Sequence, residues 1–231
     1  MSDRYERSRT RFAATLDRIA TAEQPVDVRR VAVLIGLPLR WWRSRLRWSL
    51  SGGLLGRTRA ASDFLVQQRA CFSTHRDYWR RVGAAMDYAT RDIRRTGVKL
   101  FEHARLRDLK ACVEGPNDAL VLVSHQVSKT EFELDCQNVP VQMLQDLLHS
   151  RASCKPLVLM YVVCESAGWA AASKARLPGT MFSADYEVSL HVALPLLALC
   201  LQELDGTISL AEAQRRAVAK YSTRSAKAGD R

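Results

Sequence analysis

The chain has 231 residues, which is enough for one domain with a good hydrophobic core and a smaller accessory segment. Hydrophobic residues make up 47% and charged residues 26% of the sequence, a balance that excludes an intrinsically disordered chain. The formal net charge of +11 favours acidic partners such as nucleic acid, anionic lipid or acidic proteins, without choosing among them.

Six cysteines are scattered along the chain, with no CxxC pair and no close Cys/His spacing. This pattern argues against a zinc site or a dense disulfide framework and favours a reduced protein. The N-terminal sequence MSDRYERSRTRF lacks the apolar centre of a signal peptide, and no apolar run approaches the roughly 20 residues that span a bilayer. We therefore expect a cytoplasmic protein.

The first part of the chain shows apolar positions at helical spacing, such as Phe12, Leu16 and Ile19, and no convincing strand pattern. Two prolines and a Ser-Gly-Gly tripeptide interrupt the pattern and predict helix boundaries. Residues 1–96 are therefore predicted to form a helical N-terminal extension.

Within this extension, one segment interleaves tryptophan with arginine directly after the apolar sequence VAVLIGLPL. That composition suits an anionic membrane interface or nucleic acid. We prefer the alternative that the apolar side chains pack the extension onto the rest of the protein while the arginines stay solvated. The residues concerned are Arg40, Trp41, Trp42, Arg43, Arg45, Arg47 and Trp48.

After Gly97 the pattern changes to strands that alternate with helices. VKLF predicts a strand and residues 104–113 a helix. The apolar run ALVLVS, which ends at His125, predicts a strand buried on both faces of a parallel sheet. VPVQMLQDLLHS then predicts an amphipathic helix, and LVLMYVV predicts a second buried strand that runs into Cys164. Strand, helix and strand form a βαβ unit with a right-handed crossover.

The rest of the chain continues this alternation. Residues 170–175 predict a helix, GTMFSA a strand, and the apolar stretch from Ser189 to Leu204 another helix. GTISLAEAQRRAVAKY predicts a closing helix with Ser209 as its N-cap. We expect an α/β domain over residues 97–221, with a mainly parallel sheet flanked by helices, and a disordered tail over 222–231.

His125 and Cys164 each follow a predicted buried strand, and one crossover joins the two strands. Ligands bind at the carboxyl ends of the strands in an open parallel α/β sheet, so both residues should lie at the same edge. An imidazole beside a thiol raises the thiolate fraction and can return a proton to a leaving amine. The pair is a candidate catalytic dyad, although a lone cysteine at a strand end is more often an inert buried thiol.

Roughly the C-terminal 120 residues resemble the CHAT family of caspase-like peptidases. The resemblance lies in SHQ after one strand, CESAG after the next, the strand GTMFSADYEV and the closing helix GTISLAEAQRRA. It implies a caspase-like fold and thiol peptidase activity without a metal or organic cofactor, with Cys164 as nucleophile and His125 as general base and acid. Stand-alone members are often encoded beside proteins that they activate by cleavage, which makes a protein substrate in bacterial defence or cell death the expected partner.

One residue departs from the family pattern, because Gln126 stands where these peptidases usually have glycine after the histidine. The backbone amides of Gln126 and Cys164 are the expected oxyanion hole. Asp185 and Glu187 follow the strand after the nucleophile, where the family resemblance implies residues that line the first specificity pocket. An acid there would favour Arg or Lys before the cut bond.

Two other functions stay open. Gln126 is consistent with a lost oxyanion hole, which would make the protein an inactive caspase-like regulatory binding module. Alternatively, the protein could be a basic protein that binds membranes or nucleic acid through residues 31–50. Its affinity for phosphate groups would then fall steeply with increasing salt concentration. Reaction of Cys164 with a substrate-like electrophile separates the peptidase from the binding module.

Overall fold

A parallel β-sheet forms the centre of the part of the chain that the computed structural model describes, namely residues 24–36, 87–134, 137–151, 157–163, 166, 168–169, 181–182 and 190–229. Within these residues, five strands pair in the order β2-β1-β3-β7-β8, and each neighbouring pair is parallel. The strands are β2 (Lys99–Phe101), β1 (Val31–Ile35), β3 (Ala119–Val123), β7 (Val158–Val162) and β8 (Met181–Phe182). The predicted α/β class with a mainly parallel sheet is confirmed.

The three inner strands are continuous apolar runs, VAVLI, ALVLV and VLMYV, and every residue in them is buried. A strand that is covered on both faces buries its side chains in both directions, so apolar and polar residues do not alternate along it. Val33 of β1, Val121 of β3 and Met160 of β7 lie side by side in register. The buried strands that were predicted before His125 and Cys164 are confirmed.

Strand β1 corrects the expectation that residues 1–96 contain helices and no strand. Its sequence VAVLI is bounded by the 3-10 helix η1 (Val28–Arg30) and by Gly36, and periodicity alone cannot distinguish so short an apolar run from a buried helix. Pairing with both β2 and β3 makes it a strand, because that position buries every one of its side chains. Val31–Ile35 therefore belongs to the α/β core and is not available to a bilayer or to nucleic acid.

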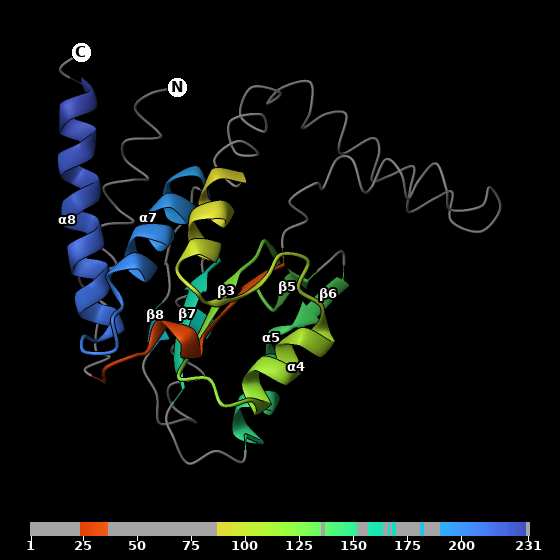
Figure 1. Ribbon diagram of the computed structural model, residues 1–231. Helices are drawn as coiled ribbons and strands as arrows, with labels where there is room; N and C mark the ends of the chain where they lie inside the picture. The colour runs from red at the N-terminus through yellow and green to blue at the C-terminus, as the bar shows by residue number, and fades with distance from the viewer. Residues whose placement is uncertain are drawn as a thin grey trace, which may run out of the picture.

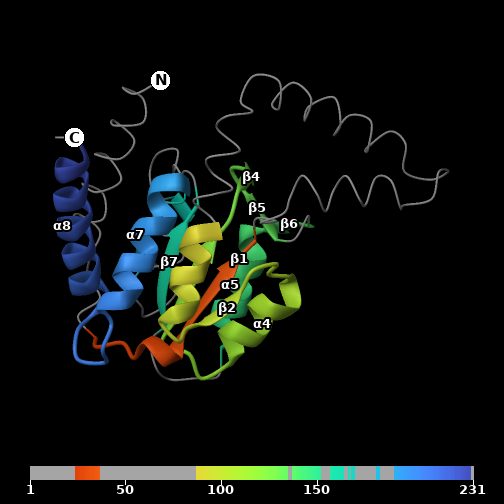
Figure 2. The ribbon, with the colours of Figure 1, turned by 45° about the horizontal axis from the view of Figure 1, so that its top comes forward.

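One face of the sheet is covered by the helical stretch 87–95, by α7 (Leu190–Glu203) and by α8 (Leu210–Gly229), as Figures 1 and 2 show. Leu194 and Leu197 of α7 are buried in the same cluster as the valines of β1 and β3. Helix α7 packs against both the sheet and α8 (Figure 1), which explains why the predicted helix is apolar on most of its surface.

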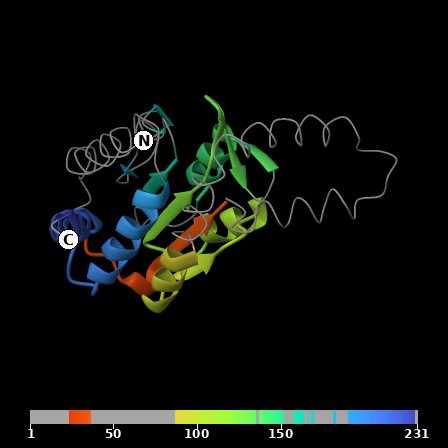
Figure 3. The same ribbon diagram turned by 90° about the horizontal axis from the view of Figure 1, so that it is seen from above.

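The other face is covered by α4 (Leu106–Glu114) and α5 (Val141–His149), which confirms two further predicted helices. Leu109 of α4 and Leu144 of α5 are buried in one cluster with Leu122 of β3. Figure 3 looks down on the layers and shows α7 and the stretch 87–95 on one side of β1 and β3, with α4 and α5 on the other. The described helices therefore sandwich the sheet.

A small antiparallel sheet, which the sequence did not predict, lies in the chain between β3 and α5. Among the described residues it consists of β4 (Gln126–Ser128), β5 (Glu131–Leu134) and β6 (Gln137–Pro140), in that order. Phe132 and Leu134 are fully buried in the core under α4 and α5. Figure 2 shows this small sheet beyond the carboxyl end of β1.

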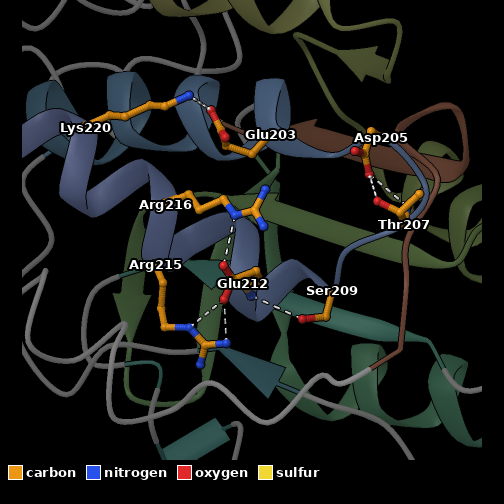
Figure 4. Close-up of polar contacts among 8 residues, drawn as sticks. All are labelled: Glu203, Asp205, Thr207, Ser209, Glu212, Arg215, Arg216 and Lys220. Carbon is orange, nitrogen blue, oxygen red and sulfur yellow. Dashed lines mark hydrogen bonds and ion pairs between the residues drawn. The ribbon is translucent and has the colours of Figure 1, made fainter.

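Helix α8 begins with the cap that the sequence predicts, because the amide of Glu212 donates to the hydroxyl of Ser209 at 3.2 Å (Figure 4). The carboxylate of Glu212 in turn accepts a hydrogen bond from Arg215 at 2.7 Å. The helix continues to Gly229, so residues 222–229 are helical where a disordered tail was expected, and residues 230–231 lie outside the described part of the chain. Alanine, arginine and lysine in this stretch are strong helix formers, and no proline interrupts them. Of the helices in the described ranges, none combines the length and hydropathy that a membrane crossing requires.

The amino ends of the strands are closed by a polar network. Arg30, before β1, forms an ion pair with Asp118, before β3, at 3.0 Å. The side chain of Asn117, which is 3% exposed, donates to the carbonyl of Cys112 at 2.7 Å. Arg151 donates to the carbonyl of Asn117 at 2.9 Å. Two of these contacts satisfy the backbone carbonyls of Cys112, near the end of α4, and of Asn117, shortly before β3. The network therefore holds the amino end of the sheet together.

Candidate active site

His125 lies two residues after the end of β3, at the carboxyl end of the sheet, and its side chain is exposed to solvent. The amide of Ser124 donates to the carbonyl of Val162 at 3.3 Å. The contact between β3 and β7 therefore continues one residue past the pair Val123↔Val162. A parallel α/β sheet presents its groups to ligands at this edge, so the imidazole is placed where chemistry is expected.

Cys164 itself lies outside the described residues. Its neighbour Val163 is described and fully buried, and it follows β7 directly. In the sequence, His125 and Cys164 each stand two positions beyond the pair Val123↔Val162. The described register is therefore compatible with the expectation that His125 and Cys164 follow neighbouring strands at equivalent positions, at the same edge of the sheet.

The backbone of His125 is held by the small antiparallel sheet. The amide of Glu133 donates to the carbonyl of His125 at 3.0 Å, and the hydroxyl of Ser124 donates to the carbonyl of Glu133 at 2.5 Å. Ser124 is only 3% exposed, so water competes little for its hydroxyl. Together the two bonds attach the end of β3 to β5 and fix the point at which His125 leaves the sheet.

Gly36 allows β5 to approach the carboxyl end of β1 closely. A Cβ atom at this position would lie 2.3 Å from the carbonyl oxygen of Glu133 and 2.8 Å from a methyl carbon of Leu134. The amide of Gly36 also donates to the carbonyl of Val123 at 2.8 Å. In a sheet with this strand order, ligands ordinarily bind in the crevice between the carboxyl ends of β1 and β3. Here β5 fills that crevice. A ligand at this end of the sheet must therefore bind beside β5.

Gln126, the predicted oxyanion donor, begins β4 opposite Phe132 and has a half-buried side chain. Hydrogen-bonded and non-hydrogen-bonded pairs alternate along an antiparallel ladder. Because Glu133 bonds to the carbonyl of His125, the pair Gln126↔Phe132 is of the second kind. The amide of Gln126 consequently points away from β5 and is not consumed by that strand.

Trp169 is a buried residue of this region that sequence reasoning did not single out. It is 6% exposed, and its ring lies 5.8 Å from the ring of Phe132 in β5 and 6.4 Å from that of Tyr161 in β7, centroid to centroid. Its indole Nε1 donates to the carbonyl of Lys129 at 3.0 Å. One indication of this role was present in the sequence, namely a tryptophan shortly after the CES motif. A buried indole usually finds an acceptor for its N–H, so a tryptophan near a proposed site is a candidate for a specific hydrogen bond.

Other predicted site residues also lie outside the described residues and stay predictions. Asp185 and Glu187, the expected specificity acids, are among them. The interleaved arginine and tryptophan residues of the N-terminal part are the others, namely Arg40, Trp41, Trp42, Arg43, Arg45, Arg47 and Trp48. Of the residues predicted for the peptidase site, the structure thus describes His125 and Gln126, which are adjacent in the chain.

Two further cysteines of the described part of the chain, Cys112 and Cys200, are free and buried in the core. Burial raises the pKa of Cys112 to about 11, and the charge of Asp108 adds to this effect. Burial also raises the pKa of Cys200 far above that of an ordinary thiol. Thiolates are the reactive form of cysteine, so these two thiols should react slowly with electrophiles at neutral pH.

No protein-family model matches this chain, and no curated protein is significantly similar to it. Within the described ranges, no group of three or more histidine, cysteine, aspartate or glutamate residues is arranged to hold a metal ion.

Proposed function

We propose that the protein is a caspase-like cysteine endopeptidase in which His125 and Cys164 form the catalytic dyad. The observation that carries this proposal is the exposed imidazole of His125 at the carboxyl end of β3, beside the strand whose sequence leads to Cys164. The attachment of His125 to β5 supports it further, because a general base must be held within reach of its partner. The CES motif and the order of the elements add the family resemblance.

In the proposed mechanism, the Cys164 thiolate attacks the carbonyl carbon of the scissile peptide while His125 holds the thiol proton. The C–N bond breaks as the imidazolium gives that proton to the leaving amine, which leaves a thioester on Cys164. His125 then takes a proton from water, the hydroxide attacks the thioester, and the thiol is regenerated with release of the carboxylic acid. The amides of Gln126 and Cys164 stabilise the oxyanion in both steps.

The proposed substrate is a cytoplasmic protein that is activated by cleavage in a bacterial defence or cell-death setting. The family resemblance supports this setting, and the net charge of +11 would attract an acidic partner. Asp185 or Glu187 would select Arg or Lys before the cut bond through a charge-assisted hydrogen bond. A substrate with a basic cleavage site inside an acidic protein meets both conditions.

Hydrolysis of a mixed-position fluorogenic peptide library tests the dyad. Wild-type protein is compared with Cys164→Ala, with His125→Ala and with His103→Ala, a matched variant of another exposed histidine. We expect cleavage after Arg or Lys that disappears in the first two variants and persists in the third. Cleavage that survives in Cys164→Ala, or no cleavage together with no labelling of Cys164 by an electrophilic peptide, contradicts the proposal.

A regulatory binding module without catalysis is the second candidate, and the side chain of Gln126 is the observation that favours it. This side chain is half-buried beside the proposed oxyanion hole, where glycine is usual in the resembling family, and it could crowd the scissile carbonyl. Gln126→Gly separates the two candidates. If Gln126 has abolished activity, the Gln126→Gly variant should hydrolyse peptides that the wild type does not. If the wild type is already an active enzyme, hydrolysis by the variant should be unchanged or lower.

A further inference from the structure

We propose that Trp169 is a positioning residue that aligns the segment carrying Cys164 with the small antiparallel sheet that carries His125. The role in catalysis rests on the proposed function. The alignment itself rests on contacts of Trp169 and can be measured without any peptidase activity.

The contacts of Trp169 join two segments that lie far apart in the sequence. Its indole N–H donates to the carbonyl of Lys129 at 3.0 Å, across 40 positions of sequence. Lys129 lies in the turn between β4 and β5, four residues after His125, whereas Trp169 stands five residues after Cys164. The hydrogen bond therefore links the chain segments that follow the two proposed catalytic residues, independently of the pairing between β3 and β7.

The aromatic contacts hold the indole in the orientation that this hydrogen bond needs. The ring of Trp169 is tilted by 43° against Phe132 and meets Tyr161 nearly edge-on at 82°. Phe132 belongs to β5 and Tyr161 to β7, so one side chain contacts both the small sheet and the strand before Cys164. The edge-on contact with Tyr161 is a preferred geometry for aromatic pairs, and the two ring contacts together restrict rotation of the indole.

Close packing alone does not explain the presence of an indole N–H at position 169. Phenylalanine would fill much of the same space and keep an aromatic ring beside Phe132, but it has no N–H to offer to Lys129. A carbonyl in a turn can also bond to water, so the fold does not depend on this acceptor being satisfied by protein. The structure therefore assigns the indole N–H to alignment of the two segments.

Trp169→Phe in the full chain tests this assignment, with Phe132→Leu as its matched control. The first variant removes the donor and keeps a ring, whereas the second weakens the packing and keeps the donor. We expect Trp169→Phe to lower kcat by about 10- to 100-fold with little change in KM, because small displacements of catalytic groups cost factors of this size. We expect Phe132→Leu to lower the urea midpoint more than Trp169→Phe does, with a smaller effect on kcat.

Two further measurements separate failure of this proposal from failure of the proposed function. Hydrogen exchange of Trp169→Phe should be about tenfold faster in both segments, 125–130 and 164–169, because the lost bond is the link between them. The rate of Cys164 alkylation by iodoacetamide, followed by mass spectrometry over a range of pH, should shift toward an ordinary thiol in Trp169→Phe and in His125→Ala. The charged side chains of the small sheet, Lys129, Glu131 and Glu133, are the same in both variants.

The outcomes are distinct. Unchanged exchange in either segment of Trp169→Phe overturns the alignment, whatever the activity. An alkylation profile that changes in His125→Ala but not in Trp169→Phe overturns the positioning role and leaves the dyad standing. A profile that changes in neither variant, with no hydrolysis by the wild type, removes the proposed function and with it any catalytic role for Trp169.

Discussion

The two ends of the central sheet are built differently. At the amino end, Arg30, Asp118, Asn117 and Arg151 bond to one another or to backbone carbonyls, and Asn117 is almost completely buried. At the carboxyl end, apolar packing, backbone bonds and the buried hydroxyl of Ser124 hold β5 in place, and an exposed histidine follows β3. Polar groups at the amino end are thus used by the fold, whereas the imidazole at the carboxyl end is presented to solvent.

This difference indicates where changes should affect stability and where they should affect function. Charges that are paired and partly buried are costly to disturb, because removal of one partner leaves the other without compensation. An exposed side chain contributes little to the free energy of unfolding.

His125→Ala should separate activity from stability most completely. Loss of the proposed general base should lower peptide hydrolysis by about 10²- to 10⁴-fold. The free energy of unfolding should change by less than about 0.5 kcal/mol, because the side chain is exposed. Initial rates and urea unfolding of the same preparation check both statements. A large loss of stability would show that His125 serves the fold, as the residues of the amino end do.

Gly36→Ala should be the most destabilising small change at the carboxyl end. The new Cβ would lie 2.3 Å from the carbonyl oxygen of Glu133, so β5 must move or the variant must lose stability, by about 3 kcal/mol. Gly168→Ala is the matched control, since no described atom lies within 4 Å of a Cβ there. Urea unfolding measures both variants. Equal stability of the two would mean that β5 is loosely attached to the sheet.

Asn117→Ala should destabilise the amino end without affecting hydrolysis. The substitution leaves the buried carbonyl of Cys112 without the donor that lies 2.7 Å away, which should cost about 2 kcal/mol. Asn138→Ala, at an exposed position of β6, should change stability by less than about 0.5 kcal/mol. Thermal unfolding and peptide hydrolysis of both variants provide the comparison. Loss of activity in Asn117→Ala at a temperature where it is folded would contradict the separation of the two ends.

Asp205, in the loop before α8, should give a small loss of stability in acid. The hydroxyl and amide of Thr207 donate to its carboxylate at 2.6 and 2.8 Å (Figure 4), and these bonds hold its pKa below the usual value. A depressed folded pKa contributes stability above the unfolded pKa of about 4, and that contribution disappears as the pH falls through the lower folded value. Asp205→Asn should therefore flatten the pH dependence of the urea midpoint below about pH 4. An unchanged slope would show that the carboxylate is not selectively stabilised.

The elements with a strong local pattern could be predicted from the sequence. ALVLV and LVLMYVV are long enough, and sufficiently rich in β-branched residues, to identify β3 and β7 as buried strands. The capping serine of α8 was identified for a similar reason, since Ser209 precedes Glu212 at the spacing that a cap requires. Each of these features depends on neighbours in the chain.

The features that were missed depend on distant partners. VAVLI becomes a strand because β2 and β3 lie on either side of it, and both come more than sixty residues later in the chain. Gln126–Ser128 has two exposed residues and no apolar alternation, so only pairing with β5 makes it a strand. The role of Gly36 is visible only when the carbonyl of Glu133 lies against it.

The buried strands before His125 and Cys164, and helices α4, α5, α7 and α8, could be predicted from the sequence alone, because hydrophobic periodicity is a local property of the chain. It also carried the CES motif, on which the proposed chemistry depends. Three contacts are visible only in the folded protein: β1 pairs with β3, β5 lies between the carboxyl ends of these two strands, and Trp169 donates to Lys129. These contacts form between residues that are remote in sequence, and their stability comes from close packing and burial that no local pattern encodes.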